Sequence, residues 1–208
     1  MPKLGLMAAA NAPKRDAQYL DTFISNERPA RMVGLFTAHA LKPHDIERLV
    51  QSCLQAMREE DRGASLTLKP LGDPSPAELA AQRTWRVTVV DDSDALPHDC
   101  LVQVFEMRDP DSPHRQLLDH IGGKDPELSE AASHLAQTAQ TYLTVASGKL
   151  DDQDRVHPFQ NLVSLFTSAL GAAIVDPAGA IVTTDPGEWA DALEMSLTIE
   201  KDMGLLRR

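Results

Sequence analysis

Two glycine-lysine pairs come nearest to the loops with which proteins bind nucleotide phosphates. Gly123-Lys124 precedes a predicted helix, and Gly148-Lys149 follows an apolar segment. A nucleotide-binding loop also needs an earlier glycine at a fixed spacing, and a hydroxyl after the lysine to bind magnesium. Neither pair has that glycine, and Asp125 and Leu150 occupy the hydroxyl position. We interpret Asp125 as a helix cap, and the sequence predicts no cofactor.

The seven histidines are spread along the chain and form no metal-binding motif. His39 and His44 lie five residues apart, whereas zinc ligands usually come in closer spacings that a helix or turn fixes. Asp92 and Asp94 begin like a calcium loop, but Pro97 occupies the position that requires glycine, and no glutamate closes the loop. The sequence therefore predicts no metal site.

No motif marks a residue for covalent catalysis. The chain has no G-x-S-x-G segment, and its two cysteines, Cys53 and Cys100, lie in apolar segments. Burial among apolar side chains raises the pKa of a thiol and makes it inert. Two cysteines without a disulfide framework are typical of a reducing compartment. A site assembled from residues far apart in the sequence would show no motif, so a hydrolase remains an alternative.

The charge distribution is the most informative feature of the sequence. The net charge is −11, and residues 91–154 (the acidic stretch) carry 14 acidic and 4 basic side chains. Residues 1–90 carry 12 basic and 10 acidic side chains, so the negative surplus is local. Such a field disfavours nucleic acid, because that binding depends on neutralising phosphates, and it attracts a basic protein partner. The alternative is that the charge only keeps the protein soluble.

Four aspartates within nine residues are the predicted partner-binding site. They lie in a polar segment between two predicted strands, and this connection is longer than most hairpin loops. Like charges this close repel each other slightly in water, so a loop that keeps them together suits a recognition role. The four residues are Asp91, Asp92, Asp94 and Asp99.

No segment predicts insertion into a membrane. No apolar run approaches the roughly 18 residues that a transmembrane helix needs. Lys3 and the apolar residues 4–10 resemble the start of a secretory signal, but the run is too short and Gly5 dilutes it. We therefore expect a protein of the cytoplasm.

Apolar periodicity in the first half predicts a sheet with one long helix. Between residues 46 and 57 apolar side chains recur with helical spacing, which places Cys53 on the buried face. The predicted fold class is α+β, with a mixed or antiparallel sheet of β-α-β-β type covered by helices. Short helices are expected at residues 16–25 and 73–82. The predicted strands are residues 31–37, 65–69, 84–89 and 101–107.

The second half is predicted to be helical apart from one hairpin. A helix opens at Asp125-Pro126 and continues to Gly148, and a helix at residues 159–173, apolar on nearly all sides, is expected to be buried. A tight hairpin at residues 175–182 and a helix at residues 185–197 follow. The predicted organisation is an arm with a short helix (1–30), a sheet unit (31–107), a linker-like segment (108–125), and a helical and hairpin unit (126–208) that packs with the sheet as one domain.

The C-terminal third resembles a family of uncharacterised bacterial domains. In that family a helix ends in a Gly-Ala pair, here Gly171-Ala172, and a short strand crosses a turn. A final helix that bears an aromatic residue, here Trp189, then packs back. The resemblance implies this architecture and carries no activity or catalytic residue.

The sequence favours a non-catalytic bacterial protein that binds a protein partner through its acidic face, as a regulatory or toxin-neutralising subunit. Two alternatives stay open: a hydrolase with an assembled, metal-assisted site, and a structural subunit whose apolar second-half helices complete a homodimer. A pocket with convergent polar groups would favour the enzyme, whereas an exposed apolar patch would favour assembly.

Overall fold

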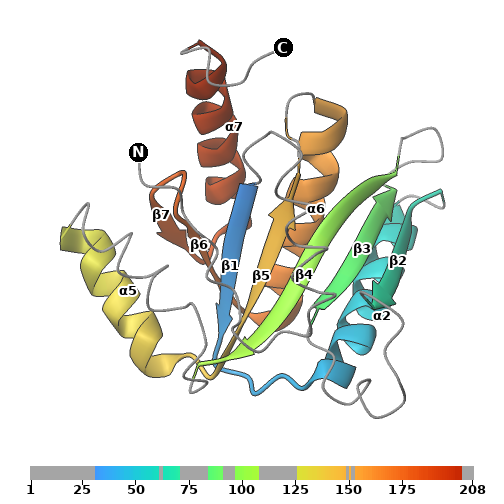
Figure 1. The fold of residues 1–208 in the computed structure, drawn as a ribbon, viewed down its shortest axis with the longest axis horizontal. Helices are drawn as coiled ribbons and strands as arrows, with labels where there is room; N and C mark the ends of the chain where they lie inside the picture. Colours follow the sequence, from blue (N-terminus) through green and yellow to red (C-terminus); the bar gives the residue numbers. More distant parts are fainter. Residues whose placement is uncertain are drawn as a thin grey trace, which may run out of the picture.

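The computed structural model shows an α+β fold built on a single sheet (Figure 1). The predicted arm at residues 1–30, the short helix at residues 73–82 and the linker-like segment at residues 108–125 lie outside the described residues. The structure describes residues 31–60, 63–70, 84–90, 97–107, 126–148, 150 and 153–202.

Every pair of neighbouring strands in the sheet runs antiparallel, so the antiparallel alternative is the one found. The strand order is β2-β3-β4-β5-β1-β6-β7. β1 therefore pairs with two strands that come much later in the chain, and this long-range pairing joins both halves of the sequence. The strands are β1 (Arg31–Thr37), β2 (Ser65–Pro70), β3 (Thr84–Val90), β4 (His98–Glu106), β5 (Thr141–Ser147), β6 (Ala173–Asp176) and β7 (Ile181–Thr183).

Helices lie on both sides of this sheet (Figure 1). α2, α6 and α7 pack on one face, and their apolar side chains join those of the strands in the main core. α5 lies on the other side, where its residue Leu135 packs against a second apolar cluster. The described helices are α2 (Pro43–Glu60), α5 (Pro126–Thr138), α6 (Gln153–Leu170) and α7 (Pro186–Asp202).

The local sequence of α2 explains where the helix starts and which face it buries. The Lys42 amide donates to the Asp45 carboxylate at 2.8 Å, so an amide at the helix start is satisfied. Pro43 has no amide hydrogen to satisfy in the first turn. Ile46 is 0% exposed and Cys53 1% exposed, which confirms the prediction that Cys53 faces the core.

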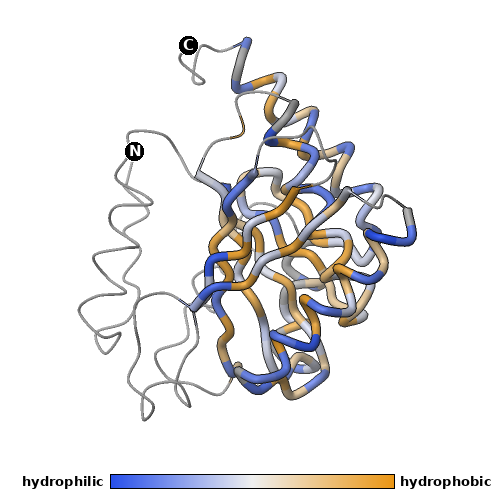
Figure 2. Tube along the Cα trace, turned by 90° about the vertical axis from the view of Figure 1, so that its right-hand side faces the viewer, coloured by the Kyte–Doolittle hydropathy of each residue, from blue (hydrophilic) through white to orange (hydrophobic). Residues whose placement is uncertain are grey.

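The main core fills the space between the sheet and the helices α2, α6 and α7. Val33 of β1, Val145 of β5 and Val102 of β4 lie opposite one another in the register, and all three are 0% exposed. Phe159 of α6 meets Trp189 of α7 edge to face, with ring centroids 5.8 Å apart. Figure 2 shows hydrophobic segments gathered inside the described part and hydrophilic segments at its outer helix turns.

A ladder of three aromatic rings crosses the opposite face of the sheet. Phe36 of β1, Tyr142 of β5 and Phe105 of β4 lie directly opposite one another. The Phe36 and Tyr142 rings stack at 4.9 Å between centroids, and the Phe105 and Tyr142 rings at 5.1 Å. These rings belong to the second cluster, so the central strands are buried on both faces.

The predicted helix from residue 125 to residue 148 is wrong in its second half. α5 ends at Thr138, and residues 141–147 form β5 in the middle of the sheet. The prediction that the second half is helical apart from one hairpin is therefore wrong as well, because β5 is a strand of the central sheet. The apolar residues of this segment fit a helical period, but Thr141, Tyr142, Thr144 and Val145 are β-branched or aromatic, which favours a strand. Pairing with β1 and β4 along the whole strand then decides the conformation.

Most other predicted elements are confirmed. The strand at residues 31–37 has the predicted bounds, and the strands near residues 65, 85 and 101 appear as β2, β3 and β4. The buried helix, the hairpin and the last helix appear as α6, β6 with β7, and α7. The elements that the family resemblance implies are thus present, while membership of that family stays a prediction.

Candidate protein-binding surface

The first turn of α7 is fixed by the residues that precede it. Asp185 accepts a hydrogen bond from the Gly187 amide at 2.8 Å, which satisfies one of the amides that a helix start leaves without a partner. Glu188 accepts a hydrogen bond from the hydroxyl of Thr183 in β7. The start of α7 is therefore tied to the strand before it.

A buried ion pair anchors α7 to the sheet. Asp176 at the end of β6 is 0% exposed, and its Oδ2 lies 2.9 Å from Arg31 Nη2 and 3.1 Å from the indole nitrogen of Trp189. Its Oδ1 accepts hydrogen bonds from the amides of Ala178 and Gly179 in the turn before β7. A buried carboxylate is tolerated when it is paired and hydrogen-bonded. Asp176 meets both conditions and joins β1, β6 and α7.

Arg31 extends this anchor toward the end of α7. Its Nη1 donates to Ser196 Oγ at 3.1 Å and to a Glu200 carboxylate oxygen at 3.3 Å. The helix is therefore held at Trp189 and again at Ser196 and Glu200. The backbone positions from which the outer side chains of α7 project are consequently set before any partner binds.

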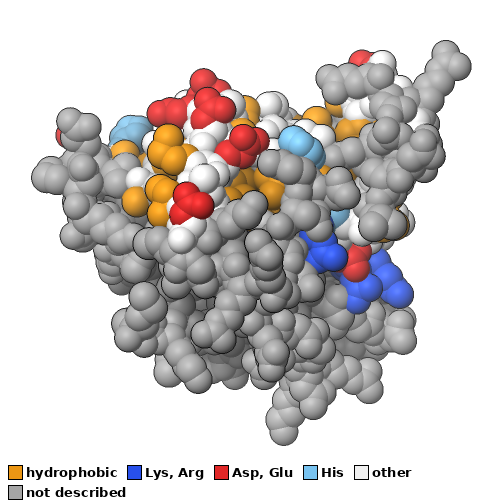
Figure 3. All heavy atoms as spheres, turned by 90° about the horizontal axis from the view of Figure 1, so that it is seen from above, with side chains coloured by type: hydrophobic (Ala, Val, Ile, Leu, Met, Phe, Trp, Pro, Cys, Tyr) orange, Lys and Arg blue, Asp and Glu red, His pale blue; other side chains and the backbone are white. Residues whose placement is uncertain are grey.

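The outer face of α7 combines exposed apolar and acidic side chains. Met195 is 66% exposed and Ile199 is 49% exposed, and both lie on one side of the helix at i and i+4. α7 carries five carboxylates and one lysine. Acidic and apolar side chains gather over this helix in the view from above (Figure 3). We call the exposed residues that share this side the acidic face of α7: Glu188, Asp191, Glu194, Met195, Thr198, Ile199 and Asp202.

Of the four predicted partner-binding aspartates, only Asp99 belongs to the described residues. Asp91, Asp92 and Asp94 lie outside them. Asp99 is the second residue of β4 and accepts a 2.6 Å hydrogen bond from the Thr88 hydroxyl of β3. Its other carboxylate oxygen lies 3.6 Å from Arg86 Nη1. Asp99 is thus a strand residue with two cross-strand partners, and the role of the four aspartates in binding stays a prediction.

The structure does not bring Asp99 close to the acidic face of α7. β5, β1 and β6 lie between β4 and β7 in the sheet. α7 packs beside β7, on the face of the sheet that α2 and α6 also cover. The sequence did predict the helix at residues 185–197 but not its acidic face. The available signal was that Met195 and Ile199 fall out of phase with Trp189, which faces the core.

Two further groups with potential chemistry are buried, the pair of His98 and Ser147 in the sheet and Cys53 in α2. His98 Nε2 lies 2.9 Å from Ser147 Oγ, but His98 is 7% exposed and Ser147 0% exposed. The pair joins β4 to β5 inside the fold. Burial raises the pKa of the Cys53 thiol to about 11, which disfavours the reactive thiolate. Within the described ranges, no group of three or more His, Cys, Asp or Glu side chains could hold a metal ion.

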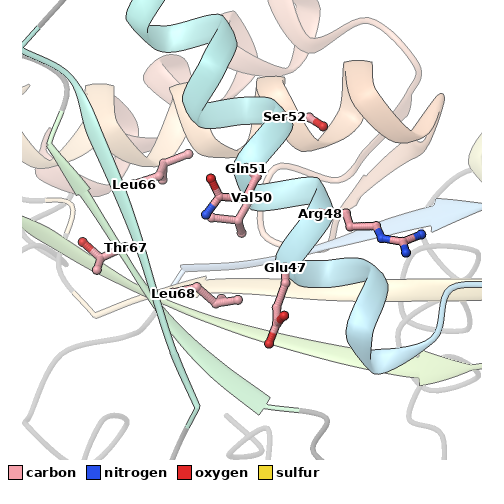
Figure 4. A pocket seen from close by; sticks show the side chains of 8 residues that line it. All are labelled: Glu47, Arg48, Val50, Gln51, Ser52, Leu66, Thr67 and Leu68. Atoms are coloured by element: carbon pink, nitrogen blue, oxygen red, sulfur yellow. The ribbon is translucent and has the colours of Figure 1, made fainter.

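An open hollow lies between α2 and β2, with a volume of about 690 Å³ (Figure 4). Its lining combines the apolar side chains Val50 and Leu66 with polar ones that include Glu47 and Gln51 of α2. A second hollow of about 410 Å³ continues along α2 past Leu54 to Arg58. Both are open surface hollows rather than enclosed cavities, so they suit contact with a macromolecule better than capture of a small molecule.

None of the helices in the described part of the chain is long and apolar enough to cross a membrane. Comparison with models of protein families, with curated proteins and with solved structures gave no match.

Proposed function

We propose that this protein is a non-catalytic binding subunit that holds a basic protein partner on the acidic face of α7. One observation carries the proposal: Met195 and Ile199 are exposed on a helix that a buried ion pair fixes in place, and carboxylates surround them. Regulation or neutralisation of that partner is the biological role that such binding would serve.

The composition of this face matches the anatomy of a protein interface. Such interfaces have an apolar centre in which methionine is enriched, and a polar rim. Asp191, Glu194 and Asp202 form a rim of one sign, which selects a partner with the opposite charge. A helix that presents anchors at i and i+4 fits an apolar groove. Because the helix is already ordered, binding costs little conformational entropy.

The acidic stretch supplies the long-range part of the attraction in this proposal. Its surplus of ten negative charges, 14 acidic against 4 basic side chains, steers a basic partner toward the protein before contact forms. The aspartates near residue 91 would then affect how fast the partner arrives, whereas α7 holds it. We also place the protein in the cytoplasm, because Cys53 and Cys100 are free thiols and such thiols persist in reducing compartments.

Site-specific photo-crosslinking in the native host tests this assignment. A photoreactive residue replaces Met195 in one variant and Ile199 in a second. The control carries it at Glu130, an exposed residue of α5. We expect the same basic protein to be crosslinked at both positions of α7 and not at the control position. A partner crosslinked equally at Glu130, or crosslinked there alone, would refute α7 as the binding surface.

A further inference from the structure

β2 is an edge strand of the sheet that the described residues form, with β3 as its neighbour. The hollow beside it is lined by Leu66, Thr67 and Leu68. Successive side chains of a strand point to opposite faces, so a hollow that touches three consecutive residues touches the edge of the strand itself. The N–H and C=O groups on such an edge are a template for one more strand.

The sequence of β2 suits antiparallel pairing with itself. A two-fold axis perpendicular to the sheet and midway between the Thr67 residues of two copies places Leu66 of each copy opposite Leu68 of the other, on the face that α2 covers. It places Thr67 opposite Thr67 on the other face, and Lys69 opposite Ser65. Apolar pairs and threonine pairs stabilise neighbouring strands, and this register brings no like charges together.

The side of α2 that borders this edge is self-complementary in charge. Glu47, Gln51, Leu54 and Arg58 follow one another at helical spacing and line the two hollows. The same two-fold axis turns two copies of α2 antiparallel. With the axis between Gln51 and Leu54, Glu47 of each copy faces Arg58 of the other, so the opposite charges meet twice.

The distribution of charge also favours contact at this edge. Residues 1–90, which include α2 and β2, are nearly neutral, while the negative surplus lies after residue 90. β2 and β7 are at opposite edges of the sheet (Figure 1). Two copies joined at β2 would keep their acidic α7 faces far apart and accessible.

We propose that this protein forms a symmetric homodimer in which two β2 edges pair and the sheet continues from one copy into the other. The contact is isologous, with the same patch on both copies. It uses the α2–β2 edge rather than the second-half helices. The dimer is independent of the proposed partner on α7, because the two surfaces do not overlap.

A charge-reversal pair tests the symmetry directly. Glu47→Arg creates two Arg–Arg contacts in the dimer, and Arg58→Glu creates two Glu–Glu contacts. We expect each variant alone to raise the dimer dissociation constant about tenfold or more in sedimentation equilibrium of the full chain. Mixing the two variants restores both pairs in a heterodimer, so the mixture should associate as tightly as the wild type. The double variant Glu47→Arg, Arg58→Glu should do the same by itself.

The control is Glu130→Arg, the same charge change on exposed α5, which should leave the dissociation constant unchanged. Circular dichroism of each variant confirms that it folds. A wild-type chain that sediments as a monomer at all accessible concentrations overturns the proposal. So does a dimer that both single variants leave intact, since that dimer would use another surface.

Discussion

Asp176 links three elements through one carboxylate, and this explains why the hairpin and the last helix keep their relative position. The carboxylate is fully buried and bonds to Arg31, Trp189 and two turn amides. Gly179 belongs to this turn, and a Cβ there would lie 3.3 Å from Asp176 Oδ2. The sequence shows Asp176 only as a turn residue, because its partner Arg31 is 145 residues away.

Removal of this carboxylate should therefore be costly. We expect Asp176→Ala to lower the free energy of unfolding by about 3–5 kcal/mol, because it leaves the Arg31 charge buried without its main partner. Glu200→Gln is the matched control, since Glu200 also contacts Arg31 but is partly exposed, and it should cost less than about 1 kcal/mol. Urea unfolding curves measure both. Equal effects of the two variants would show that the buried pair does not anchor α7.

Cys53 makes the stability of the fold depend on pH at alkaline values. Its thiol has a pKa raised from 9.0 to about 11 by burial, so the unfolded chain loses this proton at lower pH than the folded chain. The contribution of the neutral thiol is complete below pH 9.0 and falls as the pH rises toward 11. The full effect is about 3 kcal/mol, because each pKa unit corresponds to about 1.4 kcal/mol.

We expect Cys53→Ala to abolish this part of the pH dependence. The difference in free energy of unfolding between wild type and variant should shrink as the pH rises from 9.0 toward 11. Chemical denaturation at several pH values under reducing conditions measures it. A difference that is constant with pH, or rapid labelling of Cys53 in the native protein, would contradict the buried position.

At the scale of elements, prediction succeeded where local periodicity and tertiary position agree. α2 shows this, because its buried stripe and its capping residues are all within the helix or next to it. β5 shows the opposite case. Its apolar residues Tyr142, Leu143 and Ala146 also fit a helical stripe, and the evidence for a strand comes from β1 and β4, which are distant in the sequence.

Val145 distinguishes the strand from the helix that the sequence suggested. In a helix that buries Leu143 and Ala146, Val145 would lie off the apolar stripe, and Val145→Ala would be neutral or stabilising because alanine favours helices. In β5 it is 0% exposed between Val33 and Val102. We therefore expect Val145→Ala to lower the free energy of unfolding by about 1–3 kcal/mol. An unchanged denaturation midpoint would argue against β5.

At the scale of the whole molecule, the strand order explains why the two predicted sequence units share one sheet. β5 belongs to the second unit but lies between β4 and β1 of the first. No local pattern encodes that insertion, so the sequence predicted the fold class without predicting the topology. The candidate site also depends on tertiary structure that no local pattern encodes. The local charge surplus was visible in the sequence, but the exposed side of α7 depends on which side Trp189 and Leu193 bury.

The separation of α7 from Asp99, the described member of the four predicted aspartates, leads to a kinetic prediction for partner binding. Charges at a distance or at an interface rim change mainly the association rate, whereas side chains in the contact change the dissociation rate. We expect Asp91→Asn, Asp92→Asn and Asp94→Asn together to slow association and flatten its salt dependence, with dissociation unchanged. Met195→Ala with Ile199→Ala should instead speed dissociation about tenfold or more, since the few residues that dominate an interface each cost over about 1 kcal/mol when truncated.

The partner that crosslinking identifies is purified without the crosslink, and its association and dissociation rates with each variant are measured at two salt concentrations. These rates separate the outcomes. Asp99 is left intact in the loop variant, because its bonds to Thr88 and Arg86 hold β3 against β4 and its loss would mix stability with binding. If the loop variant speeds dissociation, the aspartates lie in the contact and the partner reaches beyond α7. If neither rate changes in the loop variant, Asp91, Asp92 and Asp94 play no part in capture.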